Sequence, residues 1–152
     1  MPGAVYIEGD GLTLNTIEES DLPFLRDTIN AQAVRAGLLY RPPLNLDDKR
    51  DYFEEVITAD GSVNLLVCFD EELAGTIGLE SIDDVNGTAE IGLFLAEPYW
   101  GEGHGTEATR LLTEFAFQER RLHRIYARVR TGNDASARIW EKLGYRHEAT
   151  LH

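Results

Sequence analysis

Hydrophobic and polar residues alternate along several short stretches of the chain, as they do in half-buried β-strands. The alternation predicts strands at 11–17, 62–69, 73–82, 88–95, 123–130 and 145–151. The acidic pair Asp70 and Glu71 separates the second of these strands from the third, and the turn "DDVNG" separates the third from the fourth. These short connections predict antiparallel pairing of the three strands.

Other stretches repeat apolar residues every three or four positions, the spacing of one face of a helix. They predict helices at 21–34, 46–59 and 133–144, and a long helix with this apolar face: Ala108, Leu111, Leu112, Phe115 and Ala116. Ser20 and Asn45 are expected to cap the first two helices, and Gly144 to end the last one. The order of elements predicts one mixed α/β domain over residues 1–152, with a mostly antiparallel sheet and helices on both of its faces.

The composition of the chain indicates a folded domain and a cellular compartment. The chain has 152 residues, 43% of them hydrophobic, which suits one folded domain rather than a disordered segment. Its longest apolar run, "LLVCF", is too short to cross a membrane, and its first residues show no secretory signal. Cys68 is the only cysteine, so no internal disulfide can form. We expect a cytoplasmic protein without a membrane partner.

The charge of the chain is strongly negative. Asp and Glu number 27 against 14 Lys and Arg, for a formal net charge of −13. The acids are scattered, which favours a halophilic type of acidic surface over a surface that attracts a cationic partner such as a polyamine. A broad basic surface for nucleic acid is excluded by the same count. Arg124, Arg128 and Arg130 share a strand face with Tyr126, and we expect this face to be paired with acids.

Three glycines precede the long helix in "EPYWGEGHGTEATRLLTEFAF". A helix N-terminus exposes N–H groups that bind anions, and glycines let the backbone approach a pyrophosphate closely. An ordinary tight turn would use the same residues, so the loop alone leaves both interpretations open. A P-loop is excluded because no Gly-Lys-Ser/Thr follows. Gly103, Gly105 and Ala108 fit G-x-G-x-x-A, but "AEPYW" separates them from the preceding strand, and the next strand has no acid at its tip.

The segment "AEIGLFLAEPYWGEGHGTEATRLLTEFAFQERRLHRIYARVRTGNDASARIWEKLGYRHEATL" resembles the core of a GNAT superfamily N-acetyltransferase. It is most similar to the branch that acetylates ribosomal-protein N-termini, with the polyamine acetyltransferases also near. The resemblance implies a GNAT fold and the transfer of an acetyl group from acetyl-CoA to a primary amine. A protein N-terminus and a small amine are the candidate acceptors, and the variable early helices at 20–59 would select between them.

The resemblance also assigns residues to acetyl-CoA. It implies that a glycine loop wraps the pyrophosphate with backbone N–H groups, at Gly101, Glu102, Gly103, His104, Gly105 and Thr106. It implies that the backbone of the preceding strand pairs with the pantetheine arm, at Leu93, Phe94 and Leu95. Asn133 and Trp140 are expected beside the same arm. Trp100 stands where the family usually has Gln or Arg, as it does in part of the ribosomal-protein branch.

Acetyl transfer to an amine needs a group that takes a proton from the amine, and it is helped by one that stabilises the leaving thiolate. Glu90, on the cofactor strand, is the first candidate for the base, with Glu80 or a water relay as alternatives. The family often places an acidic tyrosine where this chain has Trp140. Ser136 is therefore the first candidate for the acid, with Tyr145, Tyr99 or unaided departure of the thiolate as alternatives.

Further expectations complete the interpretation. Trp140 at the tyrosine position also fits a domain that binds acyl-CoA as a sensor with little turnover. His104, His123 and His147 lack the spacing of metal ligands, so we predict no metal site. The family usually adds a strand after the one predicted at 145–151, and an exposed edge there would favour a homodimer.

Overall fold

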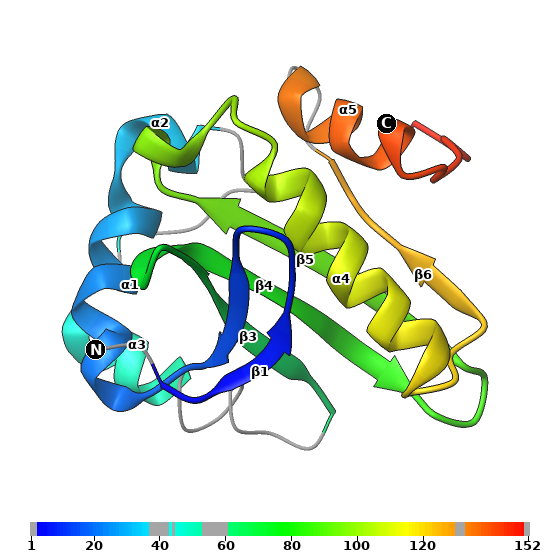
Figure 1. The fold of residues 1–152 in the computed structure, drawn as a ribbon, viewed down its shortest axis with the longest axis horizontal. Coiled ribbons are helices and arrows are strands. Elements are labelled where there is room, and N and C mark those ends of the chain that lie inside the picture. The colour runs from blue at the N-terminus through cyan, green and yellow to red at the C-terminus, as the bar shows by residue number, and fades with distance from the viewer. Residues whose placement is uncertain (1–2, 37–42, 44, 53–60, 130–132, 151–152) are drawn as a thin grey trace.

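The computed structural model describes residues 3–36, 43, 45–52, 61–129 and 133–150. Its centre is a six-stranded sheet whose strands lie side by side in the order of the sequence (Figure 1). The strands are β1 (Val5–Glu8), β2 (Thr13–Thr16), β3 (Val63–Phe69), β4 (Glu72–Asp83), β5 (Thr88–Leu95) and β6 (Arg124–Tyr126). All neighbours pair antiparallel except β5 and β6, which are parallel. The predicted mixed α/β class is confirmed.

The β3–β4 hairpin shows how the sequence specifies this sheet. Asp70 and Glu71 form its turn with φ of 51° and 65°, the left-handed conformation that a tight two-residue hairpin requires. The apolar residues of β3 are buried on both faces, because helices cover the sheet from both sides. The antiparallel order predicted for residues 62–95 is therefore confirmed.

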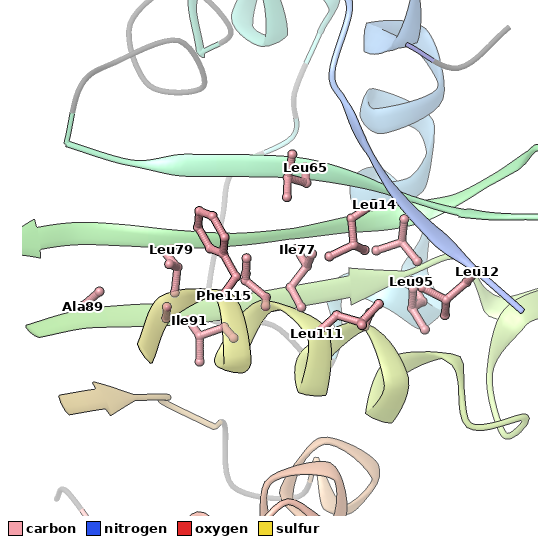
Figure 2. Packing of buried hydrophobic residues seen from close by; sticks show 14 of the residues in the cluster. Leu12, Leu14, Leu65, Ile77, Leu79, Ala89, Ile91, Leu95, Leu111 and Phe115 are labelled. Carbon is pink, nitrogen blue, oxygen red and sulfur yellow. The ribbon is translucent and has the colours of Figure 1, made fainter. Parts of the chain in front are cut away.

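Helix α4 (His104–Gln118) lies across one face of the sheet, and its predicted apolar face is fully buried there. Figure 2 shows Leu111 and Phe115 of α4 packed over Ile77, Leu79 and Ile91 of the central strands. Helix α5 (Asp134–Lys142) packs beside α4. The opposite face holds a smaller cluster under α1 (Leu22–Asn30), which contains Leu22, Leu25, Leu66 and Cys68.

The N-terminal third differs from the prediction in three places. Strand β1 was not predicted, because three of its four residues are exposed and its order depends on pairing with β2. Ser20 is not a cap: Glu18 and Asp21 cap a single 3-10 turn ahead of α1, with Glu18 N–H donating to Asp21 Oδ2 at 2.8 Å. Extended backbone at Ala31 divides the predicted helix 21–34 into α1 and α2 (Gln32–Arg35).

The predicted helix 46–59 begins as expected. Helix α3 (Leu46–Tyr52) is capped by Asn45, whose Oδ1 accepts from Asp48 N–H at 2.8 Å. The remainder of the predicted helix, 53–59, lies outside the described residues. No helix in the described part of the chain is long and apolar enough to cross a membrane.

The C-terminal strand prediction is wrong for residues 145–150, which form no strand. Tyr145 is instead held by the end of α5, where its N–H donates to the Trp140 carbonyl at 2.9 Å. Gly144 follows the end of α5 with a positive φ of 86°, the left-handed conformation that glycine adopts after a helix. The neighbouring strand is also shorter than the predicted 123–130, since β6 ends at Tyr126.

Candidate active site

Strands β5 and β6 run side by side at one end and then separate. Parallel pairing joins residues 88–90 to residues 124–126, and within the described ranges no later residue of β5 pairs with β6. Strand β5 nevertheless continues to Leu95, paired with β4 along its other edge. Buried backbone groups need hydrogen-bond partners, so the free edge of β5 can bind an extended ligand. We call this place the β5–β6 gap.

The backbone groups of Leu93 and Leu95 face the β5–β6 gap. Ala96 N–H donates to Ala74 C=O of β4 at 2.8 Å, and the direction of the backbone groups alternates along an antiparallel strand. The backbone N–H and C=O groups of Leu93 and Leu95 therefore point away from β4. Those of Phe94 point toward β4, and its side chain belongs to the cluster under α1. Of the three predicted pantetheine residues, two thus present their backbone to the gap.

The glycine loop leads directly into the N-terminus of α4. Gly101 and Gly103 have φ of 79° and 85°, and a Cβ at either position would meet nothing within 4 Å. Gly103 is the N-cap of the helix and has no side chain that could accept from the first N–H groups. The first N–H groups of α4 therefore remain available to an anion. A pyrophosphate cradle needs such groups, and the assignment of this loop to a pyrophosphate stays a prediction.

Gly105 has a different role from the other two glycines. It is buried, and a Cβ there would lie 2.9 Å from Ile139 Cδ1 and 3.3 Å from Leu93 Cδ2. Its missing side chain lets the first turn of α4 approach β5 and α5 together. Gly105 thus sets the position of the helix N-terminus relative to the β5–β6 gap, while Thr106 follows it in the first turn.

The side chains of Glu102 and His104 turn toward each other and toward the β3–β4 hairpin. His104 Nε2 lies 3.1 Å from Glu102 Oε2. The His104 ring also packs against Phe69, with 4.3 Å between the ring centroids. The His104 ring is engaged within the protein, and we still expect the backbone of this loop to make the contacts to a ligand.

Trp100 joins the glycine loop to the end of β5. Its indole Nε1–H donates to the Leu95 carbonyl at 2.8 Å, while the residue remains 45% exposed. A Gln or Arg at this position would offer its polar end to a phosphate. Trp100 instead uses its only donor to fix the start of the loop against the strand.

Helix α5 brings the remaining predicted residues together. Asn133 caps it, with Oδ1 accepting from Ser136 N–H at 3.2 Å. One turn later the Trp140 indole Nε1–H donates to Ser136 Oγ, also at 3.2 Å. Trp140 is buried and packs against Tyr145, with ring centroids 5.1 Å apart. A hydroxyl that accepts from tryptophan still has its own proton to donate, so this contact orients Ser136 as a donor.

The alternative acids have hydroxyls that are already engaged. Tyr145 Oη lies 2.7 Å from Thr113 Oγ1, and burial raises the pKa of this phenol. Tyr99 donates to Glu72 Oε2 at 3.0 Å, and desolvation followed by this acidic neighbour raises its pKa. Both phenol hydroxyls are thus held by neighbouring side chains. The Ser136 hydroxyl is a weaker acid than a phenol, but its contact with Trp140 orients it as a hydrogen-bond donor, so the geometry favours Ser136 for stabilising a thiolate by a hydrogen bond.

The predicted base lies at the place where β5 and β6 begin to separate. Glu90 is the last residue of β5 that pairs with β6, and it stands directly opposite Glu80 on β4. Arg128 binds Glu90 with two hydrogen bonds, Nε to Oε2 at 2.7 Å and Nη2 to Oε1 at 3.2 Å. Arg124 pairs with Glu148, so the expected pairing of the arginine face with acids is confirmed for these two residues. Arg130 lies outside the described residues.

Sequence reasoning missed the contacts that connect distant segments. The Arg128–Glu90 pair joins residues 38 positions apart. The spacing of residues within one predicted element therefore does not predict this pair. The Trp100–Leu95 bond depends on where the loop places the indole relative to the end of β5, which the sequence does not indicate. A signal did exist for Arg128: in the predicted strand 123–130 it shares a face with Tyr126, and this face was expected to pair with acids.

The comparison with known families agrees with this geometry. Residues 11–146 match the acetyltransferase (GNAT) domain family. The chain belongs to this family and is an acetyl-transferring enzyme.

Relatives of the chain are named as acetyltransferases too. An uncharacterized N-acetyltransferase, p20, from Bacillus licheniformis is 30% identical over 145 residues, which cover 92% of this chain and 82% of the relative. The ribosomal-protein-serine acetyltransferase of Escherichia coli is 32% identical over 92 residues, 60% of this chain and 51% of that protein. The structure of spermidine N-acetyltransferase from Vibrio cholerae in complex with CoA and spermine superposes with a TM-score of 0.86. It shares 22% identity over 93% of this chain and 84% of its own, and supports the fold.

Proposed function

We propose that this enzyme transfers the acetyl group of acetyl-CoA to the α-amine of a protein or peptide N-terminus. The observation that carries the donor assignment is the placement of the β5–β6 gap beside the uncapped N-terminus of α4. An extended chain with a pyrophosphate at one end needs such a pair of features: a free strand edge and a cluster of N–H donors.

The donor residues follow from this placement. Gly101, Gly103 and the first turn of α4 would hold the pyrophosphate, with Trp100 fixing the start of the loop. Leu93 and the Leu95 N–H would pair with the extended arm, since the Leu95 carbonyl already accepts from Trp100. A backbone N–H at this edge is also suited to stabilise the negative charge that develops on a thioester carbonyl oxygen during acyl transfer.

We assign the acceptor to the sheet face opposite α4, at a place where two neighbouring strands have glycine. Gly78 of β4 and Gly92 of β5 are directly opposite each other. Each lies two residues along its strand from the Glu80–Glu90 pair. Gly92 is exposed, and a Cβ there would meet nothing within 4 Å. An amine above Gly92 would therefore reach both the β5–β6 gap and the carboxylate of Glu90.

In this arrangement Glu90 takes the proton that the ammonium group must lose before it attacks. Its partner Arg128 is 58% exposed while Glu90 is 18% exposed, and in this proposal the incoming ammonium replaces the guanidinium as the cation beside Glu90. Acetyl-CoA supplies an activated acyl group and a thiolate leaving group. The Ser136 hydroxyl, oriented by Trp140, would donate a hydrogen bond to the departing sulfur.

The relatives named after ribosomal-protein acetylation favour an N-terminal acceptor, whereas the fold shared with a spermidine acetyltransferase supports a polyamine. The ratio of the two activities separates them. We expect acetylation of a peptide with a free N-terminal serine to exceed acetylation of spermidine, measured by mass spectrometry with acetyl-CoA. A matched peptide with a blocked N-terminus and one lysine is the control. Faster modification of spermidine or of the blocked peptide would contradict the N-terminal assignment.

A further inference from the structure

The turn between β1 and β2, residues 9–12, is held against the first turns of α4 by Glu107. Glu107 Oε2 accepts from Asp10 N–H at 3.0 Å. A Cβ at Gly9 would lie 2.5 Å from Leu111 Cδ1 and 3.0 Å from Glu107 Oε2, so the missing side chain of Gly9 leaves room for this contact. Glu107 thus joins the N-terminal hairpin to the helix whose N–H groups are proposed to hold the pyrophosphate.

The position of Glu107 brings a negative charge close to a proposed site for an anion. Its Cα lies four residues after the N-cap Gly103, about 6 Å along the helix axis, and helical side chains lean toward the N-terminus. The hydrogen bonds from Arg110 lower the pKa of Glu107, so its carboxylate is ionised at neutral pH. Charges of the same sign repel, so this carboxylate on its own would weaken the binding of a pyrophosphate.

Arg110 supplies the opposite charge. Its Nε donates to Glu107 Oε1 at 2.8 Å and its Nη2 to Glu107 Oε2 at 2.9 Å, the two-bond geometry that makes arginine–carboxylate pairs strong. Its Nη1 donates to Glu114 Oε1 at 2.9 Å, so all three guanidinium nitrogens bind carboxylates of α4. The Glu107 side chain is 20% exposed, which makes its charge less screened by water and salt than that of an exposed residue.

We propose that Arg110 is a positioning residue for the acetyl donor: by neutralising Glu107, it allows the hairpin contact and an anionic pyrophosphate to share the first turn of α4. The inference rests on the donor side of the proposed function, and it does not place Arg110 in contact with the ligand. Without Arg110, the Glu107 carboxylate still accepts from Asp10 N–H, but its charge is no longer compensated. Loss of Arg110 therefore weakens donor binding only while residue 107 carries a charge.

The test combines Arg110→Gln with Glu107→Gln, whose amide oxygen can still accept from Asp10 N–H. Calorimetric titration with acetyl-CoA gives the Kd of the unmodified protein, of both single variants and of the double variant. At about 0.1 M salt, where the Debye length is about 10 Å, we expect Arg110→Gln to raise the Kd about fivefold. Glu107→Gln should bind no more weakly than the unmodified protein. The double variant should bind within about twofold of it, because no charge is left at position 107.

Arg124→Gln is the matched control, because it also removes one positive charge from an exposed ion pair, here with Glu148. Arg124 lies opposite Thr88, which is seven residues and so about 23 Å along β5 from Leu95, the end of the strand beside α4. We expect this control to leave the Kd unchanged. The effect of Arg110→Gln should also disappear at 1 M salt, where the Debye length is about 3 Å. The melting temperature of each variant measures any loss of the fold.

Equal Kd values for Arg110→Gln and Arg124→Gln would overturn the proposal. A double variant that binds as weakly as Arg110→Gln would overturn it too, and would indicate that Arg110 contacts the ligand or supports the fold directly. Absence of binding to the unmodified protein would overturn the donor assignment, and this inference with it. Donor binding needs no acceptor, so these results do not depend on which amine is acetylated.

Discussion

Replacing Gly103 by aspartate is expected to weaken acetyl-CoA binding by on the order of 100-fold, with a loss of stability of about 1 kcal/mol because a side chain is strained at this positive φ. Gly103 has φ of 85°, and aspartate and asparagine are the side chains that tolerate this conformation best. A Cβ at Gly103 meets nothing within 4 Å, and an acid at a helix N-terminus interacts favourably with the helix dipole. The same carboxylate would repel a pyrophosphate held by the first turn of α4.

Gly103→Asn is the matched control, because it has nearly the same shape and conformational preference without the charge. The measurements are the KM for acetyl-CoA and the melting temperature of each variant. We expect the asparagine variant to stay within about tenfold of the wild type, since its neutral amide adds no charge repulsion. Equal KM values for the aspartate and asparagine variants would show that no anion binds at this helix N-terminus.

Ser136→Ala is expected to lower kcat roughly 10- to 100-fold, the loss of one hydrogen bond to a charged group in the transition state. Trp140 touches Ser136 through its indole N–H and acts as a positioning residue. Trp140→Phe should therefore lower kcat by a smaller factor. The double variant should be no slower than Ser136→Ala, because Trp140 can act only through the missing hydroxyl. Single-turnover kinetics at saturating acetyl-CoA measures all three.

Loss of packing is the competing explanation for Trp140→Phe, since Trp140 is buried against Tyr145. Thr113→Val is the control: it removes the contact between Thr113 Oγ1 and Tyr145 Oη without touching Ser136. We expect it to lower the melting temperature and to leave kcat unchanged. Additive effects of the Ser136 and Trp140 substitutions would contradict an action of Trp140 through Ser136.

The sequence predicts those elements whose structure is determined by residues close to one another in the chain. The apolar face of α4 repeats at helical spacing, and the two-residue turn at Asp70 and Glu71 fixes the register of the strands on either side. Strand β1 and residues 145–150 were mistaken for the same physical reason. Whether such segments join a sheet depends on a neighbouring strand, and "YRHEATL" has the alternation of a strand but is held by α5 instead.

The contacts of the candidate site, like the fold, could be expected from the sequence only in part. The positive φ of Gly101 and Gly103 could be expected from the glycines before the helix, whereas the binding role of this loop rests on the resemblance and stays a prediction. The Arg128–Glu90 pair and the Trp100–Leu95 bond could not be expected, since both depend on how β5, β6 and the loop are arranged in space. Gly105 shows the limit within the loop itself: its closeness to Ile139 depends on where α5 packs, and the spacing of the glycines contains no information about that.

The most direct test of the central claim is a calorimetric titration of the unmodified protein with acetyl-CoA, with NADH as the comparison ligand. Both ligands contain a pyrophosphate, but only acetyl-CoA has an extended arm that can pair with the free edge of β5. The titration is run at 1 M salt, where the Debye length is about 3 Å and repulsion by the acidic surface is screened. We predict binding of acetyl-CoA in the micromolar range and no detectable binding of NADH. Absence of acetyl-CoA binding, or equal binding of NADH, would contradict the assignment of the β5–β6 gap and the glycine loop to the acetyl donor.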